Sequence, residues 1–298
     1  MTYTFWILLT GCLVGVTCGV TGAILVLRKM AMIADAISHT VLLGIVGAFF
    51  ITQTISGIPM LIGAGIVGIL TAIFVEMLNS SGVQSDAAIG VVFTSLFALG
   101  VVLISFIGDQ VHLDIQHALM GEIAFVPWNT LTINGADYGP IAVWMLGGVL
   151  TINLLLITLF YKEIKMSTFD PQFATLIGVP VVMIHYLLMT MVSLSTVASF
   201  DSVGAILVVA MLIVPGATAY LLTDRFLVLL ILSGVIGILS AILGYSFAVQ
   251  FNVSIAGSMA VATGVFFLGA FLFSPKQGVI IKKLRKSGKT IEQQKAEA

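Results

Sequence analysis

This chain has few charged residues. Only 8% of its 298 residues are Asp, Glu, Lys or Arg, and 59% are hydrophobic. An ordinary soluble domain has about 25% charged residues. A bilayer accounts for the difference, because a helix needs about 20 apolar residues to cross a hydrocarbon core of roughly 30 Å. The composition therefore predicts an all-α polytopic membrane protein, and it excludes a nucleic-acid-binding surface or a long disordered region.

Cysteines are scarcer still, and two common enzyme signatures are absent. The two cysteines, Cys12 and Cys18, are six residues apart in the first apolar stretch. That spacing does not bring them together on a helix, so we expect packed thiols rather than a disulfide or a metal site. The sequence has no G-x-x-x-x-G-K-[ST] phosphate loop and no H-E-x-x-H motif. The signatures of an ATPase and of a zinc protease are therefore missing.

Apolar segments divide the chain into spans. Nine can be marked, at about 5–27, 31–52, 58–79, 86–107, 138–161, 180–197, 203–222, 226–249 and 255–273. The boundary between the sixth and seventh is the weakest, because the polar stretch there is short, and eight helices with one re-entrant segment is the alternative. The N-terminus lacks a basic region and an A-x-A-like cleavage site, which predicts a retained first helix. We expect a single membrane domain at 1–275 and a basic tail at 276–298.

The positive charges predict the orientation of the chain. Nine crossings with the N-terminus outside place all twelve Lys and Arg residues on one face: Arg28, Lys29, Lys162, Lys165, Arg225, Lys276, Lys282, Lys283, Arg285, Lys286, Lys289 and Lys295. Lys and Arg in short loops stay cytoplasmic. The pattern thus favours nine helices over eight, with the C-terminus in the cytoplasm.

The predicted outer face is acidic and carries histidines. Its longest connection, 108–137, holds His112, Asp114, His117 and Glu122. A negative vestibule would attract cations, and imidazole and carboxylate groups suit Mn, Fe or Zn. A polar surface helix that only solvates a loop would look the same, and we favour this simpler interpretation.

Two ionisable residues lie at membrane depth in the second segment. Asp35 and His39 are four residues apart, which places them on one face of a helix. Buried ionisable groups in a membrane usually face a pathway, and a carboxylate with an imidazole can hold one divalent cation. An internal Asp–His hydrogen bond, or a position of Asp35 at the membrane interface near Lys29, would explain the pair equally well. Glu76, beside a loop, and the lone His185 are weaker candidates, for which solvation and packing are the default explanations.

The linker at 162–179 predicts a short cytoplasmic helix. Asp170 suits an N-cap, Pro171 suits the first helical position, and Gly178 followed by Pro180 ends the helix. So short a helix, bearing Phe173 and Leu176, is unstable alone. A partner subunit or another part of the chain should therefore cover it.

Four stretches, taken together, resemble the ABC-3 family of metal-importer permeases. They are Leu27-Arg-Lys-Met-Ala-Met-Ile-Ala-Asp35-Ala-Ile-Ser-His39, Ser85-Asp-Ala-Ala-Ile-Gly90, Phe169-Asp170-Pro171 with Ala174 and Gly178, and Leu207-Val-Val-Ala-Met-Leu-Ile-Val-Pro215-Gly-Ala-Thr-Ala219. They resemble, in order, the family's second-helix motif, its start of helix four, its coupling helix and its proline-broken helix. The run Val111–Phe125 is more similar to manganese-type members than to zinc-type ones.

The resemblance implies a multi-pass permease of the bacterial plasma membrane that passes a divalent metal, with Mn(II) favoured and Zn(II) or Fe(II) as alternatives. It implies that Asp35 and His39 are metal ligands in the path and that no cofactor is permanently bound. It further implies that helix 170–178 docks on a separate ATP-hydrolysing subunit. Two permease chains, identical or related, would pair around the path, and an extracellular metal-binding protein or lipoprotein would feed it.

Two other functions are compatible with a polytopic membrane protein. A secondary transporter driven by protons or sodium would use Asp35, Glu76 or Asp201 as relay groups, but no convincing inverted repeat is visible in the sequence. A membrane metalloprotease would need the H-E-x-x-H motif that the chain lacks.

Overall fold

Long helices make up most of the chain. The computed structural model describes residues 3–52, 57–107, 123–133, 136–274 and 278. Within these residues nine helical spans are long and apolar enough to cross a membrane, which confirms the predicted number. The helices are α1 (Tyr3–Leu27), α2 (Ala31–Thr52), α3 (Gly57–Ser80), α4 (Ser85–Ile107), α6 (Ile141–Leu159), α9 (Val181–Leu222), α10 (Phe226–Phe251) and α11 (Ile255–Phe273), with α9 holding two spans.

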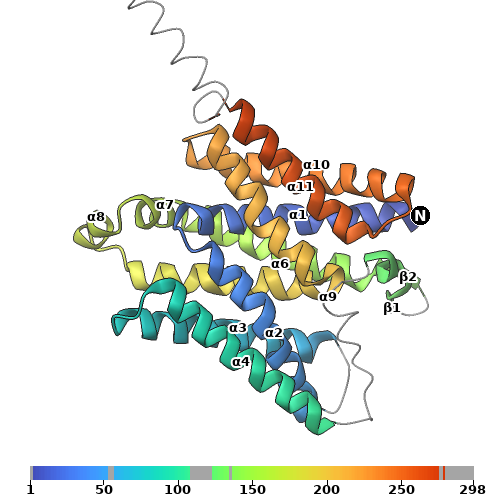
Figure 1. The fold of residues 1–298 in the computed structure, drawn as a ribbon, viewed down its shortest axis with the longest axis horizontal. Helices are drawn as coiled ribbons and strands as arrows, with labels where there is room; N and C mark the ends of the chain where they lie inside the picture. The colour runs from blue at the N-terminus through green and yellow to red at the C-terminus, as the bar shows by residue number, and fades with distance from the viewer. Residues whose placement is uncertain (1–2, 53–56, 108–122, 134–135, 275–277, 279–298) are drawn as a thin grey trace, which may run out of the picture.

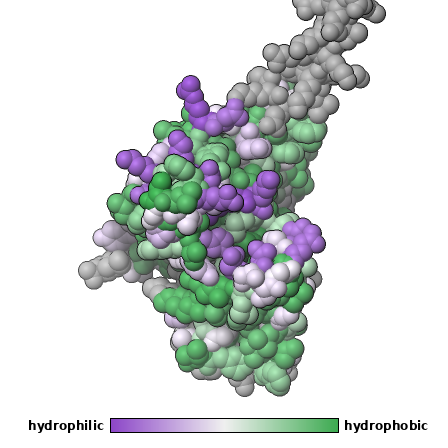
Figure 2. Space-filling model, turned by 90° about the vertical axis from the view of Figure 1, so that its left-hand side faces the viewer, coloured by the Kyte–Doolittle hydropathy of each residue, from purple (hydrophilic) through white to green (hydrophobic). Residues whose placement is uncertain are grey.

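Successive spans run in alternating directions between two ends of the molecule (Figure 1). One end carries the N-terminus and a two-stranded hairpin, and the other carries two short helices, α7 (Tyr161–Phe169) and α8 (Pro171–Leu176). The turns after α1 and after α9, together with α7, bring all the basic residues of the described chain to this second end. Hydrophilic side chains gather there among apolar ones (Figure 2). This arrangement is the one that the charge pattern predicts for a cytoplasmic face. The predicted basic tail, apart from Gly278, lies outside the described residues.

The helices pack in two groups. In the first, which we call the α2–α4 group, α2 packs on α3 and α4. In the second, the α1 group, α1 packs on both α9 and α10, and α11 joins them. The α1 and α2 helices hardly touch, although they are consecutive in the chain, and the α2–α4 group meets the rest mainly through α9 (Figure 1). A short turn at 28–30 is therefore the covalent link between α1 and the α2–α4 group.

Small residues allow the close approaches inside the α1 group. A Cβ atom added to Gly15 would lie 2.7 Å from the backbone of Gly237 on α10, and one added to Gly216 would lie 2.7 Å from Ala23 on α1. Lipid supplies no hydrophobic force between helices, so this close backbone packing is what holds them together. α1 is consequently the most buried of the nine spans.

The turn between the sixth and seventh spans differs from the prediction. We expected a polar loop at 198–202, but the backbone there is helical, and the break in helical geometry falls at Gly204. Gly204 has φ 77° and ψ 168°, a conformation essentially restricted to glycine. A single glycine therefore reverses the chain between two helices, and no loop is needed (Figure 1).

Four further elements were not predicted. Strands β1 (Thr130–Ile133) and β2 (Ala136–Pro140) form an antiparallel hairpin after a 3-10 helix, η2 (Ile123–Trp128). The hairpin takes the residues from 138 to 140, so α6 begins at Ile141 rather than at 138, because Pro140 ends the strand and caps the helix. The linker after α6 is also more helical than expected, since α7 precedes the predicted short helix.

Candidate functional site

Asp35 and His39 lie one turn apart on α2. Their side chains approach to 3.6 Å, measured from Asp35 Oδ1 to His39 Nε2. Each is about one-third exposed, at 40% for Asp35 and 34% for His39. They are the only residues between Ile33 and Val41 that are not buried. Asp35 and His39 thus form one partly exposed polar stripe on an otherwise buried stretch of α2.

The pair is separated by more than a hydrogen-bond length. N–H···O bonds have heavy-atom distances of about 2.7–3.2 Å, so at 3.6 Å the carboxylate and imidazole face a shared space. Two donors that each bind one transition-metal ion at about 2.1 Å are at most about 4.2 Å apart. The observed geometry is therefore compatible with a cation held between Oδ1 and Nε2.

Helix α4 shapes the space around the imidazole. The His39 ring centroid lies 5.8 Å from that of Phe93 and 6.0 Å from that of Phe97. The Ser38 hydroxyl donates to the Asp35 carbonyl oxygen at 2.7 Å and so turns back to the helix backbone. In the part of the chain that the structure describes, no third His, Cys, Asp or Glu joins the pair. The outer cluster His112, Asp114, His117 and Glu122 lies outside the described residues.

Helix α8 forms as its sequence predicts, but it is shorter. Asp170 Oδ1 accepts a hydrogen bond from the Phe173 amide at 2.9 Å, and Pro171 occupies the first helical position. The helix ends at Leu176, not at 178. Gly178 follows with φ 85°, a left-handed conformation that glycine adopts without penalty. The N-cap and the stop signal therefore act as expected.

The two faces of α8 have opposite environments. Ala174 is buried, whereas Phe173 is half exposed and Leu176 is 85% exposed. Phe169, the last residue of α7, is also half exposed, and its ring packs edge-on against buried Phe226 with centroids 6.0 Å apart. Large apolar side chains are thus presented at the end of the molecule where hydrophilic groups gather (Figure 2). Such a surface is typical of an interaction site.

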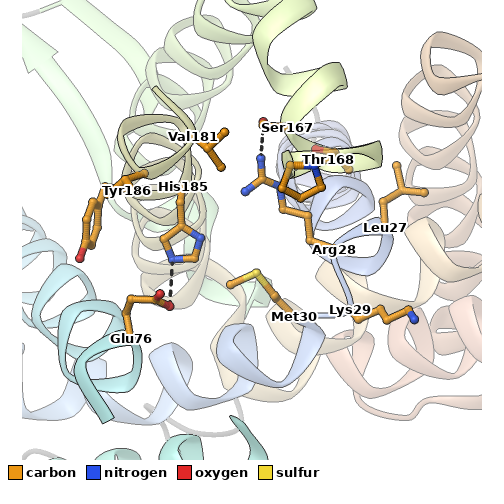
Figure 3. Close-up of a pocket in the computed structure, with 12 residues that line it drawn as sticks. Leu27, Arg28, Lys29, Met30, Glu76, Ser167, Thr168, Val181, His185 and Tyr186 are labelled. Carbon is orange, nitrogen blue, oxygen red and sulfur yellow. Dashed lines mark hydrogen bonds and ion pairs between the residues drawn. The ribbon is translucent and has the colours of Figure 1, made fainter. Parts of the chain in front are cut away.

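A pocket of about 440 Å³ lies beneath α7 and α8 (Figure 3). It is lined by residues from the end of α1, the end of α3, α7, α8 and the beginning of α9. On one wall, His185 Nε2 of α9 lies 3.8 Å from Glu76 Oε2 of α3. Glu76, for which we expected solvation alone, therefore faces His185, and the two form an ion pair when the imidazole is protonated. Neither Asp35 nor His39 lines this pocket, so the two polar sites are separate.

Arg28 occupies the opposite wall of the pocket (Figure 3). Its Nη2 atom donates to Ser167 Oγ at 2.6 Å and its Nε atom donates to Thr168 Oγ1 at 3.1 Å. Burial lowers the pKa of the guanidinium to about 10, which still leaves it charged at neutral pH. In the sequence Arg28 was informative as a positive charge and as part of the stretch that resembles the second-helix motif. Its contact with α7 joins residues 139 and 140 positions apart and has no sequence signal.

Known proteins resemble this chain over nearly its whole length. The profile of the ABC 3 transport family matches residues 1–274. The chain belongs to the ABC 3 transport family.

Relatives in this family have metal-transport names. The manganese transport system membrane protein MntD of Bacillus subtilis is 63% identical over the full length of both chains. The zinc transport system membrane protein TroD of Treponema pallidum is 44% identical, over 93% of this chain and 76% of its own. A chain of PsaBC from Streptococcus pneumoniae, solved in complex with a Fab, superposes with a TM-score of 0.78 at 34% identity, over 93% of this chain and 94% of its own. The family and the multi-pass membrane fold are thus established for this chain.

Proposed function

We propose that this chain is the membrane-spanning permease of an ATP-driven importer whose cargo is a divalent transition metal, with Mn(II) preferred over Zn(II) and Fe(II). One structural observation carries the cargo assignment: Asp35 and His39 face one space at 3.6 Å on a stretch of α2 that is otherwise buried. Family membership supports the transport class, and the manganese and zinc names of several relatives support the cargo.

In this proposal Asp35 and His39 bind the metal during its passage. A carboxylate oxygen and an imidazole nitrogen are ligands that Mn, Fe and Zn all accept. Two ligands do not complete a coordination sphere, so water and a second permease chain facing the open stripe would supply the others. The part-exposed state of both side chains leaves room for such ligands.

The proposed orientation places the N-terminus outside and the end with α7 and α8 in the cytoplasm. The one-sided distribution of the basic residues supports it. A cytoplasmic ATP-binding subunit would dock on α8 through Phe173 and Leu176, because these apolar side chains are exposed there. An extracellular metal-binding protein would deliver the ion at the opposite end.

Vesicles containing the reconstituted complex would test this function directly. The complex would comprise this chain, its ATP-binding subunit and its external binding protein. We expect uptake of radiolabelled Mn(II) to require ATP on the side of the membrane that carries the ATP-binding subunit. Uptake of Mn(II) should also exceed uptake of Zn(II). Uptake that follows an imposed proton or sodium gradient without ATP would instead establish a secondary transporter and refute the proposal.

A further inference from the structure

The turn between α1 and α2 is a compact three-residue corner. The Lys29 amide donates to Val26 and the Met30 amide donates to Leu25, at 3.1 and 3.0 Å, which is the pattern of a Schellman motif. Lys29 takes the left-handed conformation with φ 60°, a position that glycine usually fills. The chain therefore changes direction sharply at this corner and enters α2 at once, since the Ile33 amide already donates to Met30.

This corner is the direct connection between α1 and α2, whereas the other packing between the α1 group and the α2–α4 group runs mainly through α9. α1 and α2 hardly touch, so a change in the angle of the corner would move the α2–α4 group relative to the α1 group. Asp35 and His39 lie on α2, a short distance beyond the corner. A movement at residues 28–30 would therefore reach the proposed metal ligands directly through the helix that bears them.

Arg28 attaches the same corner to α7. The guanidinium fork holds two consecutive hydroxyls, Ser167 and Thr168, in the last turn of α7, just before the Asp170 N-cap of α8. The Ser167 hydroxyl also donates to the Ile164 carbonyl at 3.2 Å, which directs its lone pairs to Arg28. A planar fork that binds two acceptors fixes direction as well as distance, whereas a lysine ammonium binds as a point charge.

A simple ion pair does not explain why Arg28 is half buried here. Within the described residues no carboxylate lies at ion-pair distance from Arg28, and Glu76 in the same pocket pairs with His185. Burial of a charge without a counter-ion is costly. The partners of the half-buried guanidinium are two neutral hydroxyls, and both belong to α7.

The Glu76–His185 pair closes the other side of the pocket. Glu76 belongs to the α2–α4 group and His185 to α9, so this contact also crosses between the two groups (Figure 3). The pocket between the two contacts is an open space of about 440 Å³. One side of it is attached to α7 through Arg28.

We propose that Arg28 is a positioning residue that transmits movement of α7 and α8 to the 28–30 corner, and thereby to the α2–α4 group that carries Asp35 and His39. The proposal rests on the proposed function in so far as α8 receives an ATP-binding subunit. When that subunit closes, α7 and α8 shift together, and the guanidinium fork moves the end of α1 and the beginning of α2 with them.

The test compares Arg28→Gln with wild type in the full reconstituted complex. Two quantities are measured: the amount of Mn(II) transported per ATP hydrolysed, and the ATP-dependent change in distance between spin labels at Leu227→Cys at the beginning of α10, in the α1 group, and Ser81→Cys in the turn after α3, in the α2–α4 group. Both label sites are exposed, and the native Cys12 and Cys18 are replaced in every variant. We expect Arg28→Gln to lower the transport ratio about tenfold, as for the loss of charge-assisted hydrogen bonds, and to abolish the distance change.

Three comparisons separate positioning from a structural role. Arg28→Lys should give an intermediate ratio, because it keeps the charge but cannot bind both hydroxyls. The double variant Ser167→Ala/Thr168→Val removes the two acceptors with little change in volume and should reproduce the effect of Arg28→Gln. Arg225→Gln removes an exposed arginine at the same end of the molecule and should match wild type.

Each outcome decides between explanations. Arg28→Gln with the wild-type ratio and distance change overturns the inference, even if protein yield falls, because a structural defect would lower transport and hydrolysis together. A wild-type complex that shows the distance change but no ATP-dependent Mn(II) uptake refutes the proposed cargo and leaves the role of Arg28 to be decided by the spin labels. The inference is supported if the distance change is lost in Arg28→Gln and in the Ser167→Ala/Thr168→Val double variant and is kept in Arg225→Gln.

Discussion

The Oδ1 atom of Asp35 lies 3.6 Å from the Nε2 atom of His39, one helical turn along α2. The separation exceeds that of a hydrogen bond, and the two side chains are the part-exposed positions of a buried stretch. The alternative of a closed Asp–His hydrogen bond between helices does not fit this distance. This distance, with the part-exposed state of both side chains, is the geometric basis of the proposed metal site.

Replacement of either residue should therefore reduce metal uptake without unfolding the protein. We expect Asp35→Asn and His39→Gln each to lower uptake of Mn(II) at least about tenfold, because even groups that only support a metal ligand cost 10- to 100-fold when mutated. The double variant should abolish uptake. Radiolabelled Mn(II) uptake, normalised to the amount of permease in the membrane, provides the measurement.

Asp86→Asn is the matched control, since Asp86 is an exposed carboxylate in the first turn of α4. It should retain wild-type uptake. Full uptake by the double variant at wild-type protein level would remove Asp35 and His39 from the metal path.

The docking role of α8 predicts an effect on partner binding and not on folding. Leu176 is 85% exposed, so Leu176→Asp removes few contacts within this chain. We expect the variant to keep the thermal stability of the wild type and to weaken binding of the ATP-binding subunit about tenfold or more, as for an interface anchor. Co-purification of the two subunits and titration of their association would measure this change.

Val83→Asp tests whether any charge at this end of the molecule would have the same effect. Val83 is exposed in the turn between α3 and α4, away from α8 in the sequence. The Val83→Asp variant should bind the ATP-binding subunit as the wild type does. Equal loss of binding in both variants would indicate that the contact surface is not centred on α8.

The sequence predicted the features that depend on interactions between residues close in the chain. The spans and the N-cap at Asp170 were predictable, because hydropathy and capping act between residues that are close in the chain. The Asp35–His39 pair was visible for the same reason, since residues four apart share a helix face. Local rules were sufficient wherever one helix decided the geometry.

Contacts between distant segments were not predictable in this way. Nothing around Arg28 indicates Ser167 as its partner, and His185 appeared as a lone histidine although Glu76 of α3 pairs with it. The sharp turn at Gly204 was mistaken for a loop at 198–202, because polar residues suggested a loop while one glycine was enough to reverse the chain. These features depend on which helices meet, and only the packed structure shows that.

Gly204 should be intolerant of any side chain. Its φ of 77° with ψ of 168° is strained for every other residue, at a cost of about 1–3 kcal/mol. We expect Gly204→Ala to lower the free energy of unfolding by about that amount. Thermal unfolding of the protein in detergent, followed by circular dichroism, is the measurement.

Gly148→Ala, in contrast, should not lower the free energy of unfolding. Gly148 lies within α6, and a Cβ atom there would meet nothing within 4 Å. Alanine is favoured over glycine in a helix by up to about 1 kcal/mol, so this variant should be equal to the wild type or more stable. A stable Gly204→Ala protein would mean that the reversal between the two spans of α9 does not depend on the glycine conformation.

The contribution of Arg28 should not depend on pH in the physiological range. Burial lowers its pKa from 12.5 to about 10. Burial disfavours the charged form, so the unfolded chain binds more protons than the folded chain between those two values, and stability rises with pH only in that alkaline window. Below about pH 9 the guanidinium is protonated in both states, so its hydrogen bonds to Ser167 and Thr168 persist. We therefore expect the ratio of Arg28→Gln to wild-type transport per ATP to be equal at about pH 6.5 and about pH 8.5. A ratio that approaches one at the higher pH would show that a group titrating near neutrality, and not Arg28, connects α7 to the 28–30 corner.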